Sequence, residues 1–368
     1  MRHAVIAVAV PALALSLASC GTFDGSETSA KTSPTKGDDV TVGLLLPDTS
    51  TSRYDRFDYP IIKNRVAELT RHQGKVEYAN AEASGDKQYA QMQKMIDDKV
   101  DVILLDAVDS HAIAYEVKKA KAAGIPVIAY DRLAEGPIDA DISFDNELVG
   151  EVQARSLLKA LGPGAGISTK IVMINGSPMD PNAKQFKEGA LSQLKGTVTI
   201  AKSYDTADWD PQFAQTNMTD AINAIGKNNI AGVLAADDDM AGGVIKALKA
   251  QGVTSLPPVT GQDATLDAVQ RIVSGEQYMS VYKSYSAEAE NAAEMAITKI
   301  QGKDIEFDSL TQGKVSSPTN KDIPSQLVPV VALTKDNIKD TVIADGLYKL
   351  SDICTAKYES ECAAIGLK

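Results

Sequence analysis

Residues 100–130 read VDVILLDAVDSHAIAYEVKKAKAAGIPVIAY, and this stretch decides the fold class. Val100–Leu105 is almost entirely apolar, which is typical of a strand buried on both faces. Ile113–Ala123 has apolar residues at helical spacing, and Gly124 is a typical helix stop. Pro126–Tyr130 is a second apolar run. The stretch therefore predicts two parallel strands joined by a crossover helix.

The same alternation of strand and helix continues on both sides of this stretch. Further strands are expected at Val40–Leu46, Lys75–Tyr78, Ile142–Phe144, Lys170–Ile174, Val198–Ser203, Gly232–Ala235, Val259–Gly261 and Tyr278–Val281. Further helices are expected at Ile61–Arg71, Tyr89–Lys99, Leu148–Leu161, Ala183–Leu194, Phe213–Ala224, Ala241–Ala250, Leu266–Ser274 and Ala287–Ile300. About ten strands are more than one such sheet normally holds. We therefore expect an α/β chain with two similar lobes, each a parallel sheet with helices on both faces.

The composition excludes several classes of protein. The 368 residues are 44% hydrophobic and 23% charged, so most of the chain is expected to fold. The net charge of −12 argues against a nucleic-acid partner, which requires clustered Lys and Arg. Three His and three Cys are too few for several metal centres, and we expect neither a metal nor a cofactor. The sequence has no G-x-S-x-G elbow, P-loop or zinc-type His motif that would favour an enzyme.

The N-terminus has the pattern of an export signal. Ala4–Leu17 is an apolar run shorter than the roughly 20 residues that span a bilayer. Small residues precede Cys20, as in a bacterial lipobox, so residues 1–19 are expected to be a lipoprotein signal peptide and Cys20 the lipidated residue. The alternative is that Cys20 is an ordinary residue of the leader. Residues 20–39 are rich in Gly, Ser, Thr and Pro and predict a flexible tether.

Polar, charged or aromatic side chains follow most of the expected strands. Ligands of open α/β sheets bind beyond the carboxyl ends of the strands, so these positions predict a polar cleft. Carboxylates and amides pair with vicinal hydroxyl groups, Arg and Lys donate to sugar oxygens, and aromatic rings cover the apolar face of a pyranose. A small neutral polyol, most simply a sugar, is therefore the expected ligand. The candidate residues are Arg53, Tyr54, Arg56, Asp131, Arg132, Asp145, Asn146, Asn182, Trp209, Asp237, Asp238, Gln262, Asp263 and Lys283.

Several of these residues also have a purely structural interpretation. Asp131 and Asp145 are equally suited to helix N-caps or turns. The acidic run that starts at Asp237 is typical of a solvated helix N-terminus, which the helix dipole favours. Trp209 is also suited to a hydrophobic core, and Lys283 to an outward-pointing position at the surface.

A family resemblance covers residues from about 40 to 350. The segments that carry it are Ala129–Arg132, Ile142–Glu147, Gly176–Lys184, Asp238 with Ala241–Gly243, Gly261–Ala264, Val281–Lys283, Asp322–Ser325 and Asn337–Ile343. In this order they resemble the D-xylose-binding proteins of bacterial ABC sugar importers, which have the type I periplasmic-binding-protein fold. The resemblance implies two lobes that are joined by a three-crossover hinge and close on a monosaccharide.

The resemblance also implies roles for single residues. Tyr54 stands where the family has its first stacking Trp, Trp209 matches the second, and Asp237 stands where the relatives have Asn. Because of these two departures at positions 54 and 237, xylose, glucose, arabinose and galactose all stay candidate ligands. The implied sugar contacts are Arg53 or Arg56, Arg132, Asp145, Asn146, Asn182, Asp238, Asp263 and Lys283.

The expected division of the chain follows from the same resemblance. Lobe 1 is expected to comprise residues 40–142 and about 263–312, and lobe 2 residues 143–262 and about 313–346. The tail, residues 347–368, goes beyond the family's pattern and holds Cys354 and Cys362. Outside the cytoplasm we expect a disulfide between them, and two free thiols are the alternative.

We therefore expect a monomeric, non-enzymatic lipoprotein on the outer face of the cell membrane. It would capture a monosaccharide, most simply D-xylose, and deliver it to an ABC permease and its ATPase. A binder of another aldose and a sugar-sensing ectodomain of the same fold are the alternatives, with a sugar-modifying enzyme as a remote one. A transcription regulator is disfavoured because the leader occupies the place of a DNA-binding headpiece.

Overall fold

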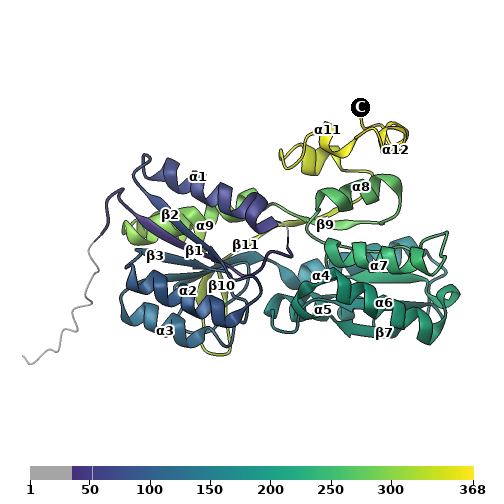
Figure 1. Ribbon diagram of the computed structural model, residues 1–368, viewed down its shortest axis with the longest axis horizontal. Coiled ribbons are helices and arrows are strands. Elements are labelled where there is room, and N and C mark those ends of the chain that lie inside the picture. The colour runs from purple at the N-terminus through teal and green to yellow at the C-terminus, as the bar shows by residue number, and fades with distance from the viewer. Residues whose placement is uncertain (1–34, 52) are drawn as a thin grey trace, which may run out of the picture. The chain divides into compact units, whose positions relative to one another are not determined.

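The structure is a computed structural model that describes residues 35–51 and 53–368 (Figure 1). The predicted signal peptide, Cys20 and most of the predicted tether lie outside the described residues. Within the described part, no helix is both long enough and apolar enough to cross a membrane.

Lobe 1 is built on a seven-stranded sheet in the order β10-β11-β5-β4-β3-β1-β2, in which only β10 is antiparallel. Its strands are β1 (Thr41–Leu46), β2 (Lys75–Asn80), β3 (Val102–Leu105), β4 (Val127–Tyr130), β5 (Ala140–Phe144), β10 (Gly313–Val315) and β11 (Ile323–Val328). Its helices are the turn η1 (Tyr54–Asp58), α1 (Tyr59–Leu69), α2 (Gly85–Asp97), α3 (Ala114–Ala122), α9 (Tyr285–Ile300) and α10 (Asp304–Leu310).

Both faces of this sheet are buried, because alternate residues of each strand pack on opposite sides. Leu44 and Leu104 pack with α1 and α9, whereas Leu45 and Leu105 pack with α2 and α3. Figure 1 shows the same two helical layers on either side of the sheet. The near-continuous apolar runs of the sequence therefore form strands that are buried on both faces, as expected.

Lobe 2 has a core sheet in the order β7-β6-β8, with β9 and β12 forming an antiparallel pair beside it. Single bridges, Val233 with Val259 and Gln262 with Val281, lead from β8 toward β9. The strands are β6 (Lys170–Asn175), β7 (Thr199–Asp205), β8 (Gly232–Ala235), β9 (Ser280–Lys283) and β12 (Val330–Leu333). The helices are α4 (Asn146–Leu161), α5 (Pro181–Leu194), α6 (Pro211–Ile225), α7 (Asp238–Ala250), α8 (Leu266–Ser274) and the short turns η2 (Ala207–Trp209) and η3 (Lys227–Asn229).

Two glycines let α4 and α5 touch through their backbones. A Cβ atom at Gly150 would lie 1.9 Å from the carbonyl oxygen of Phe186, and one at Gly189 would lie 2.0 Å from that of Glu147. Neither contact is possible for a residue with a side chain, so the two glycines fix the spacing of these helices. This packing sets the position of the first turn of α5, which carries Asn182 into the space between the lobes.

The chain crosses between the lobes three times, from β5 into α4, from β9 into α9 and from β11 into β12. The expected assignment of α9 and α10 to lobe 1 and of β12 to lobe 2 agrees with the structure, but two other later segments were assigned to the wrong lobe. Residues 313–328 belong to the sheet of lobe 1, where β11 pairs with β5, and α8 and β9 belong with lobe 2. The strand pairing decides these memberships, and the apolar pattern of single segments does not reveal it.

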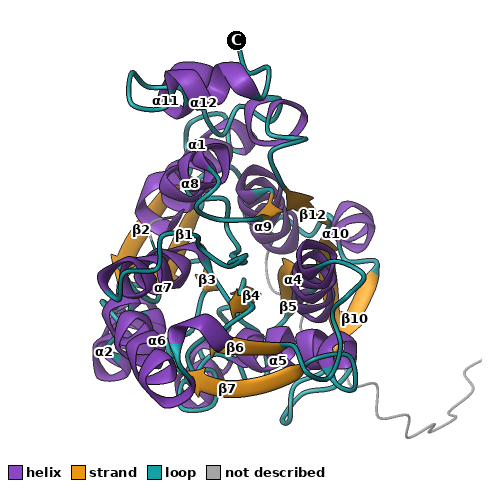
Figure 2. Ribbon diagram, turned by 90° about the vertical axis from the view of Figure 1, so that its right-hand side faces the viewer, coloured by secondary structure: helices purple, strands orange, loops and turns teal. Residues whose placement is uncertain are grey.

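The C-terminal tail packs on α8 of lobe 2, and Figure 2 shows α11 and α12 beside α8 at one end of the view. It follows the turn η4 (Lys339–Ile343) and contains α11 (Leu350–Ile353) and α12 (Glu359–Ala364). A disulfide joins Cys354 and Cys362, with an S–S distance of 2.01 Å. Ile353, Cys362 and Leu367 share an apolar cluster with residues of α8.

Candidate ligand-binding cleft

A cleft lies between the two lobes, near the carboxyl ends of β1, β4, β6 and β8. The space left inside it is only about 20 Å³. The lining residues are Thr51, Arg53, Tyr54, Asp131, Arg132, Asp180, Asn182, Phe186, Trp209, Asp237, Gln262, Asp263 and Lys283.

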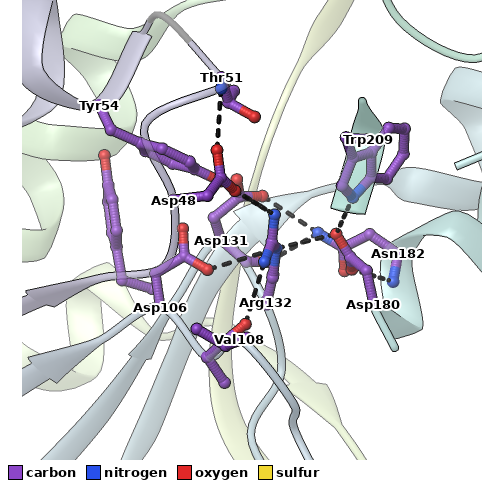
Figure 3. Close-up of polar contacts among 12 residues, drawn as sticks. Asp48, Thr51, Tyr54, Asp106, Val108, Asp131, Arg132, Asp180, Asn182 and Trp209 are labelled. Carbon is purple, nitrogen blue, oxygen red and sulfur yellow. Dashed lines mark hydrogen bonds and ion pairs between the residues drawn. The ribbon is translucent and has the colours of Figure 1, made fainter. Parts of the chain in front are cut away.

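Arg132, directly after β4, is the centre of a buried ion-pair network (Figure 3). Its Nε lies 2.8 Å from Asp180 of lobe 2 and 3.5 Å from Asp106, and its Nη2 lies 3.3 Å from Asp48. Burial alone would lower the pKa of Arg132, but Asp180 and the other carboxylates raise it well above its ordinary value. The guanidinium is therefore a fixed positive charge that joins the two lobes.

Arg53 forms a second network on the lobe 1 side. It donates from Nε to Asp58 at 2.9 Å and from Nη2 to Glu288, and its Nη1 lies 3.4 Å from Asp131. Its guanidinium carbon lies 4.5 Å from the centroid of the Tyr285 ring. Burial would raise the pKa of Asp131, but the nearby cations, Arg53 foremost, lower it below its ordinary value. Asp131 is therefore an ionised acceptor at the bottom of the cleft.

Lys283, at the end of β9, supplies the third cation of the cleft. Its Nζ lies 2.8 Å from Asp263 and 5.0 Å from the centroid of the Phe144 ring. Burial would lower the pKa of Lys283, but Asp263 outweighs this effect and raises it. Lys283 is only 3% exposed, so its alternative placement at the surface is wrong. Neighbouring Gln262 donates to the carbonyl oxygen of Ala236 at 3.2 Å.

Trp209 forms one wall of the cleft and is also part of the core of lobe 2. Its ring meets Phe186 edge to face, with centroids 6.2 Å apart, and its Nε1 donates to Asp180 at 3.1 Å. Gly176 lies against the ring, because a Cβ atom there would come within 2.0 Å of it. The two interpretations of Trp209 therefore hold together: it packs in the core and lines the cleft.

Asn182 connects the lobes at the end of the cleft. Its amide donates at 3.1 Å to both the carbonyl oxygen and the side chain of Asp131. Asp237 lines the cleft and also caps α7, because its side chain accepts from the backbone of Met240 at 2.7 Å. Burial raises the pKa of Asp237 well above its ordinary value, which favours the uncharged acid.

The structure brings most of the predicted residues together at this cleft. Ten of the candidates line it, namely Arg53, Tyr54, Asp131, Arg132, Asn182, Trp209, Asp237, Gln262, Asp263 and Lys283. These side chains therefore meet at one cleft, and their contact with a ligand stays a prediction.

Four predicted contacts do not line the cleft. Arg56 is exposed and lies over the rings of Phe57 and Tyr348 in η1 and the tail, facing away. Asp145 caps α4 by accepting from the backbone of Leu148, as its structural interpretation predicted, and Asn146 is the first residue of that helix.

Asp238 is the fourth residue outside the cleft. It is fully buried and accepts from Gln277, Ser280 and the backbone of Thr265. Burial raises the pKa of Asp238 to about 7. The carboxyl group therefore holds α7, α8 and β9 together instead of facing a ligand.

Three lining residues were not among the predicted contacts: Thr51, Asp180 and Phe186. Asp180 lies in the loop after β6, two residues before Asn182 of α5, so the strand-end pattern could have found it. Phe186 lies one helical turn after Asn182 and therefore on the same face of α5. Thr51 has no such signal. No group of residues in the described ranges could hold a metal ion.

The fold and the cleft define a class of protein: two α/β lobes, three crossovers and a small polar cleft between them. Residues 42–304 match the family model described as periplasmic binding protein domain, and the chain belongs to this family. The membership confirms the predicted fold class and the prediction of a binding protein without enzymatic activity.

Individual relatives cover most of both chains. The D-xylose-binding periplasmic protein of Escherichia coli is 36% identical over 321 residues, which are 86% of this chain and 93% of that protein. The multiple sugar-binding periplasmic receptor ChvE of Rhizobium radiobacter is 30% identical over 335 residues, 86% of this chain and 93% of that protein. A solved ABC transporter solute-binding protein from Clostridium phytofermentans with bound β-D-glucose has a TM-score of 0.75 at 25% identity, covering 85% and 99% of the two chains.

Proposed function

We propose that this protein captures a monosaccharide, with D-xylose as the leading candidate, and delivers it to an ABC importer. The observation that carries the proposal is a small cleft in which almost every cation is already paired with a carboxylate. Further support comes from the relatives, because the D-xylose-binding protein of E. coli is 36% identical to this chain.

The charges in the cleft favour a neutral ligand. Its cations are Arg53, Arg132 and Lys283, and its carboxyl groups are Asp131, Asp180, Asp237 and Asp263. Burial favours the uncharged form of Asp237, and each of the three cations already has at least one carboxylate partner. An anionic or cationic ligand would leave one charge uncompensated in a desolvated site, which is costly. Hydroxyl groups can donate to the carboxylates and accept from the cations without disturbing this balance.

The shape of the cleft also fits a pyranose. The Trp209 ring offers a flat apolar face, and the polar groups lie on the other walls. Hydrogen bonds to charged groups contribute about 1.5–3 kcal/mol each. Several of them suffice for the roughly 8 kcal/mol of a micromolar complex, after the cost of ordering the ligand.

Titration calorimetry with D-xylose, D-glucose, L-arabinose and D-galactose tests the proposal. We expect micromolar or tighter binding of at least one aldose, with D-xylose the tightest, and weaker binding by Asp263→Asn and Lys283→Met variants. An absence of heat with every aldose would overturn the proposal. A tighter complex with another of these sugars would replace D-xylose and leave the sugar-binding role intact.

Delivery of the sugar to an ABC permease and its ATPase is a separate proposal. Uptake of the bound sugar by vesicles that contain the cognate permease and ATPase would support import. Binding of the loaded protein to a sensor-kinase ectodomain, without uptake, would favour the sensing alternative instead. A single species at the mass of one chain in light scattering would support the monomer.

We also propose that Cys20 carries lipid and anchors the protein to the outer face of the cell membrane. Expression of a Cys20→Ser variant should move the protein from the membrane fraction to the soluble extracytoplasmic fraction. Mass spectrometry of the wild-type N-terminus should show a diacylglyceryl Cys20 after loss of residues 1–19. An unmodified N-terminus of a membrane-bound protein would contradict the anchor.

A further inference from the structure

A second pocket lies beside the cleft and shares two of its residues, Asp131 and Asn182. The space inside it is about 240 Å³. Its other polar lining residues include Asp141, Ser143, Asp145, Asn146, Glu147 and Gln185. Glu147, Gln185 and Ser316 are exposed, whereas Asp141 and Asn146 are buried. The pocket therefore leads from solvent to buried polar groups at the first crossover, between β5 and α4.

Two buried oxygen atoms in this pocket have no hydrogen-bond partner in the described part of the chain: Asp141 Oδ1 and Asn146 Oδ1. Asp141 is 2% exposed and Asn146 5%. Their other polar atoms are engaged, since Asp141 Oδ2 accepts from Ser325 at 2.9 Å and Asn146 Nδ2 donates to Ser143 at 3.3 Å. Buried polar atoms are seldom left unpaired. Asn146 Oδ1 is an acceptor, and Asp141 Oδ1 is one whenever its carboxyl group is ionised, so an occupant that donates hydrogen bonds would satisfy both atoms.

The charges of the second pocket differ from those of the cleft. Four carboxyl groups line it, those of Asp131, Asp141, Asp145 and Glu147, and neither Lys nor Arg is among its lining residues. Of the four, only Asp131 has an ion-pair partner in the described ranges. A pocket with carboxyl groups and no cation of its own attracts a positively charged ligand. No residues there form a cluster that could hold a metal ion.

We propose that this pocket is a second binding site, for a small cation that donates hydrogen bonds, of the ammonium or primary-amine class. Its N–H groups would pair with Asp141 Oδ1 and Asn146 Oδ1, and its charge would be balanced by the surrounding carboxylates. A quaternary ammonium ion lacks such donors and would bind poorly.

A hydrogen-bonded chain connects this site with the cleft. Asn146 donates to Ser143, Ser143 donates to the carbonyl oxygen of Asp131 at 2.6 Å, and Asn182 of lobe 2 donates to the same residue. A cation held between β5 and the start of α4, beside Asn182 of α5, would favour the arrangement in which Asn182 reaches Asp131. It would therefore strengthen ligand binding in the cleft, and the cleft ligand would strengthen cation binding by the same factor.

Titration calorimetry with methylammonium chloride on the sugar-free protein tests the site. Tetramethylammonium chloride at equal ionic strength tests the need for N–H donors. We expect saturable binding of methylammonium only. Asp141→Asn should weaken it at least tenfold, and Asn146→Asp, which adds a carboxylate, should strengthen it. Glu306→Gln removes an exposed carboxylate on α10 that has no ion pair within the described part of the chain; it is the matched control and should change nothing.

Equal behaviour of the two cations, or equal affinities of the Asp141→Asn and Glu306→Gln variants, would overturn the site. A variant that folds poorly would lose affinity for methylammonium. The higher affinity expected of Asn146→Asp therefore cannot result from poor folding. Coupling between the two sites is measured by repeating the sugar titration with saturating methylammonium. We expect the sugar to bind at least twofold more tightly. An unchanged sugar affinity would overturn the coupling. This last arm rests on the proposed function, whereas the sugar-free titration is independent of it.

Discussion

At the scale of single residues, the cleft is a set of paired charges that hold one another in place. Arg132 pairs with Asp180, Arg53 with Asp131, and Lys283 with Asp263. All three pairs are desolvated, and Arg53 and Arg132 keep further carboxylate partners. Asp263 is the one ion-pair partner of Lys283 among the described residues, so its removal would leave a buried charge uncompensated, which typically costs about 3–5 kcal/mol. The pairs therefore present their remaining donors and acceptors in fixed directions before a ligand arrives, which reduces the cost of ordering on binding.

Gly176 should control the position of Trp209 without contacting the ligand. Gly176→Ala would place a Cβ atom within 2.0 Å of the indole ring, so the ring must move. We expect the sugar affinity in calorimetry to fall at least tenfold, which corresponds to about 1.4 kcal/mol. Gly164→Ala is the control, because a Cβ atom there meets nothing within 4 Å. An unchanged affinity of Gly176→Ala would show that the ring face does not contribute to binding.

The sequence predicts which strand ends meet at the cleft more reliably than it predicts the direction of each side chain there. Asp237 and Asp238 both follow β8, but only Asp237 lines the cleft, whereas Asp238 is turned into the packing of α7, α8 and β9. Successive residues at a strand end or helix start face different directions. The strand-end rule therefore locates the site without choosing between neighbours.

At the scale of secondary-structure elements, the strands that the sequence did not reveal are β10, β11 and β12. β10 and β12 have only three and four residues, and β11, with the sequence IPSQLV, mixes polar and apolar residues instead of forming an apolar run. They exist because β5 and β9 offer free edges to pair with. β5 and β11 pair across nearly two hundred residues of sequence, and local sequence patterns carry little information about such distant pairing.

The pairing of β5 with β11 buries a carboxyl group and should make stability depend on pH. Burial raises the pKa of Asp141 to about 7. The folded state then keeps a proton that the unfolded state loses near its ordinary pKa of about 4. Stability from this group is full below pH 4 and is lost as the pH rises through 7.

Asp141→Asn should therefore remove this loss. Relative to wild type, we expect the variant to gain unfolding free energy between pH 4 and pH 8, by about 1.4 kcal/mol for each unit of pKa shift that it removes. Urea denaturation across this range measures the difference. Parallel curves for the two proteins would contradict the raised pKa.

The disulfide of the tail should stabilise α11 and α12 locally. It closes a loop with a sequence separation of eight, and loop entropy of this size corresponds to about 2–3 kcal/mol. We expect a Cys354→Ser, Cys362→Ser double variant to lose amide-exchange protection in residues 347–368. Protection in β1 and β3 should be unchanged, because these strands lie in the core of lobe 1. Equal loss in those strands would contradict a local role.

At the scale of the whole folded unit, the cleft exists only where the two lobes meet. Arg132 of lobe 1 contacts Asp180 of lobe 2 at 2.8 Å, and Asp131 of lobe 1 accepts from Asn182 of lobe 2. The space left in the cleft is only about 20 Å³, so we expect a sugar to enter while the lobes are further apart. We expect hinge motion at the three crossovers to provide that opening.

Asp180→Asn should shift this equilibrium toward separated lobes, because the charge that attracts Arg132 is removed. We expect a larger radius of gyration in small-angle X-ray scattering and at least tenfold weaker sugar binding. Asp220→Asn, on the exposed side of α6 and without an ion pair in the described ranges, is the control. Weaker sugar binding at an unchanged radius of gyration would indicate that Asp180 contacts the ligand directly and does not hold the lobes together.

The sequence by itself determined the α/β class, the two lobes and the strand ends that carry the cleft, because these follow from local periodicity and composition. It also carried the family resemblance that the comparisons bear out. Only the tertiary structure decided that residues 313–328 complete the sheet of lobe 1 and that Asp180 joins the lobes through Arg132. It also separated Asp145 and Asn146 from the cleft and placed them in a second pocket. The reason is that strand pairing and side-chain direction depend on partners distant in the chain, and local patterns carry no information about those partners.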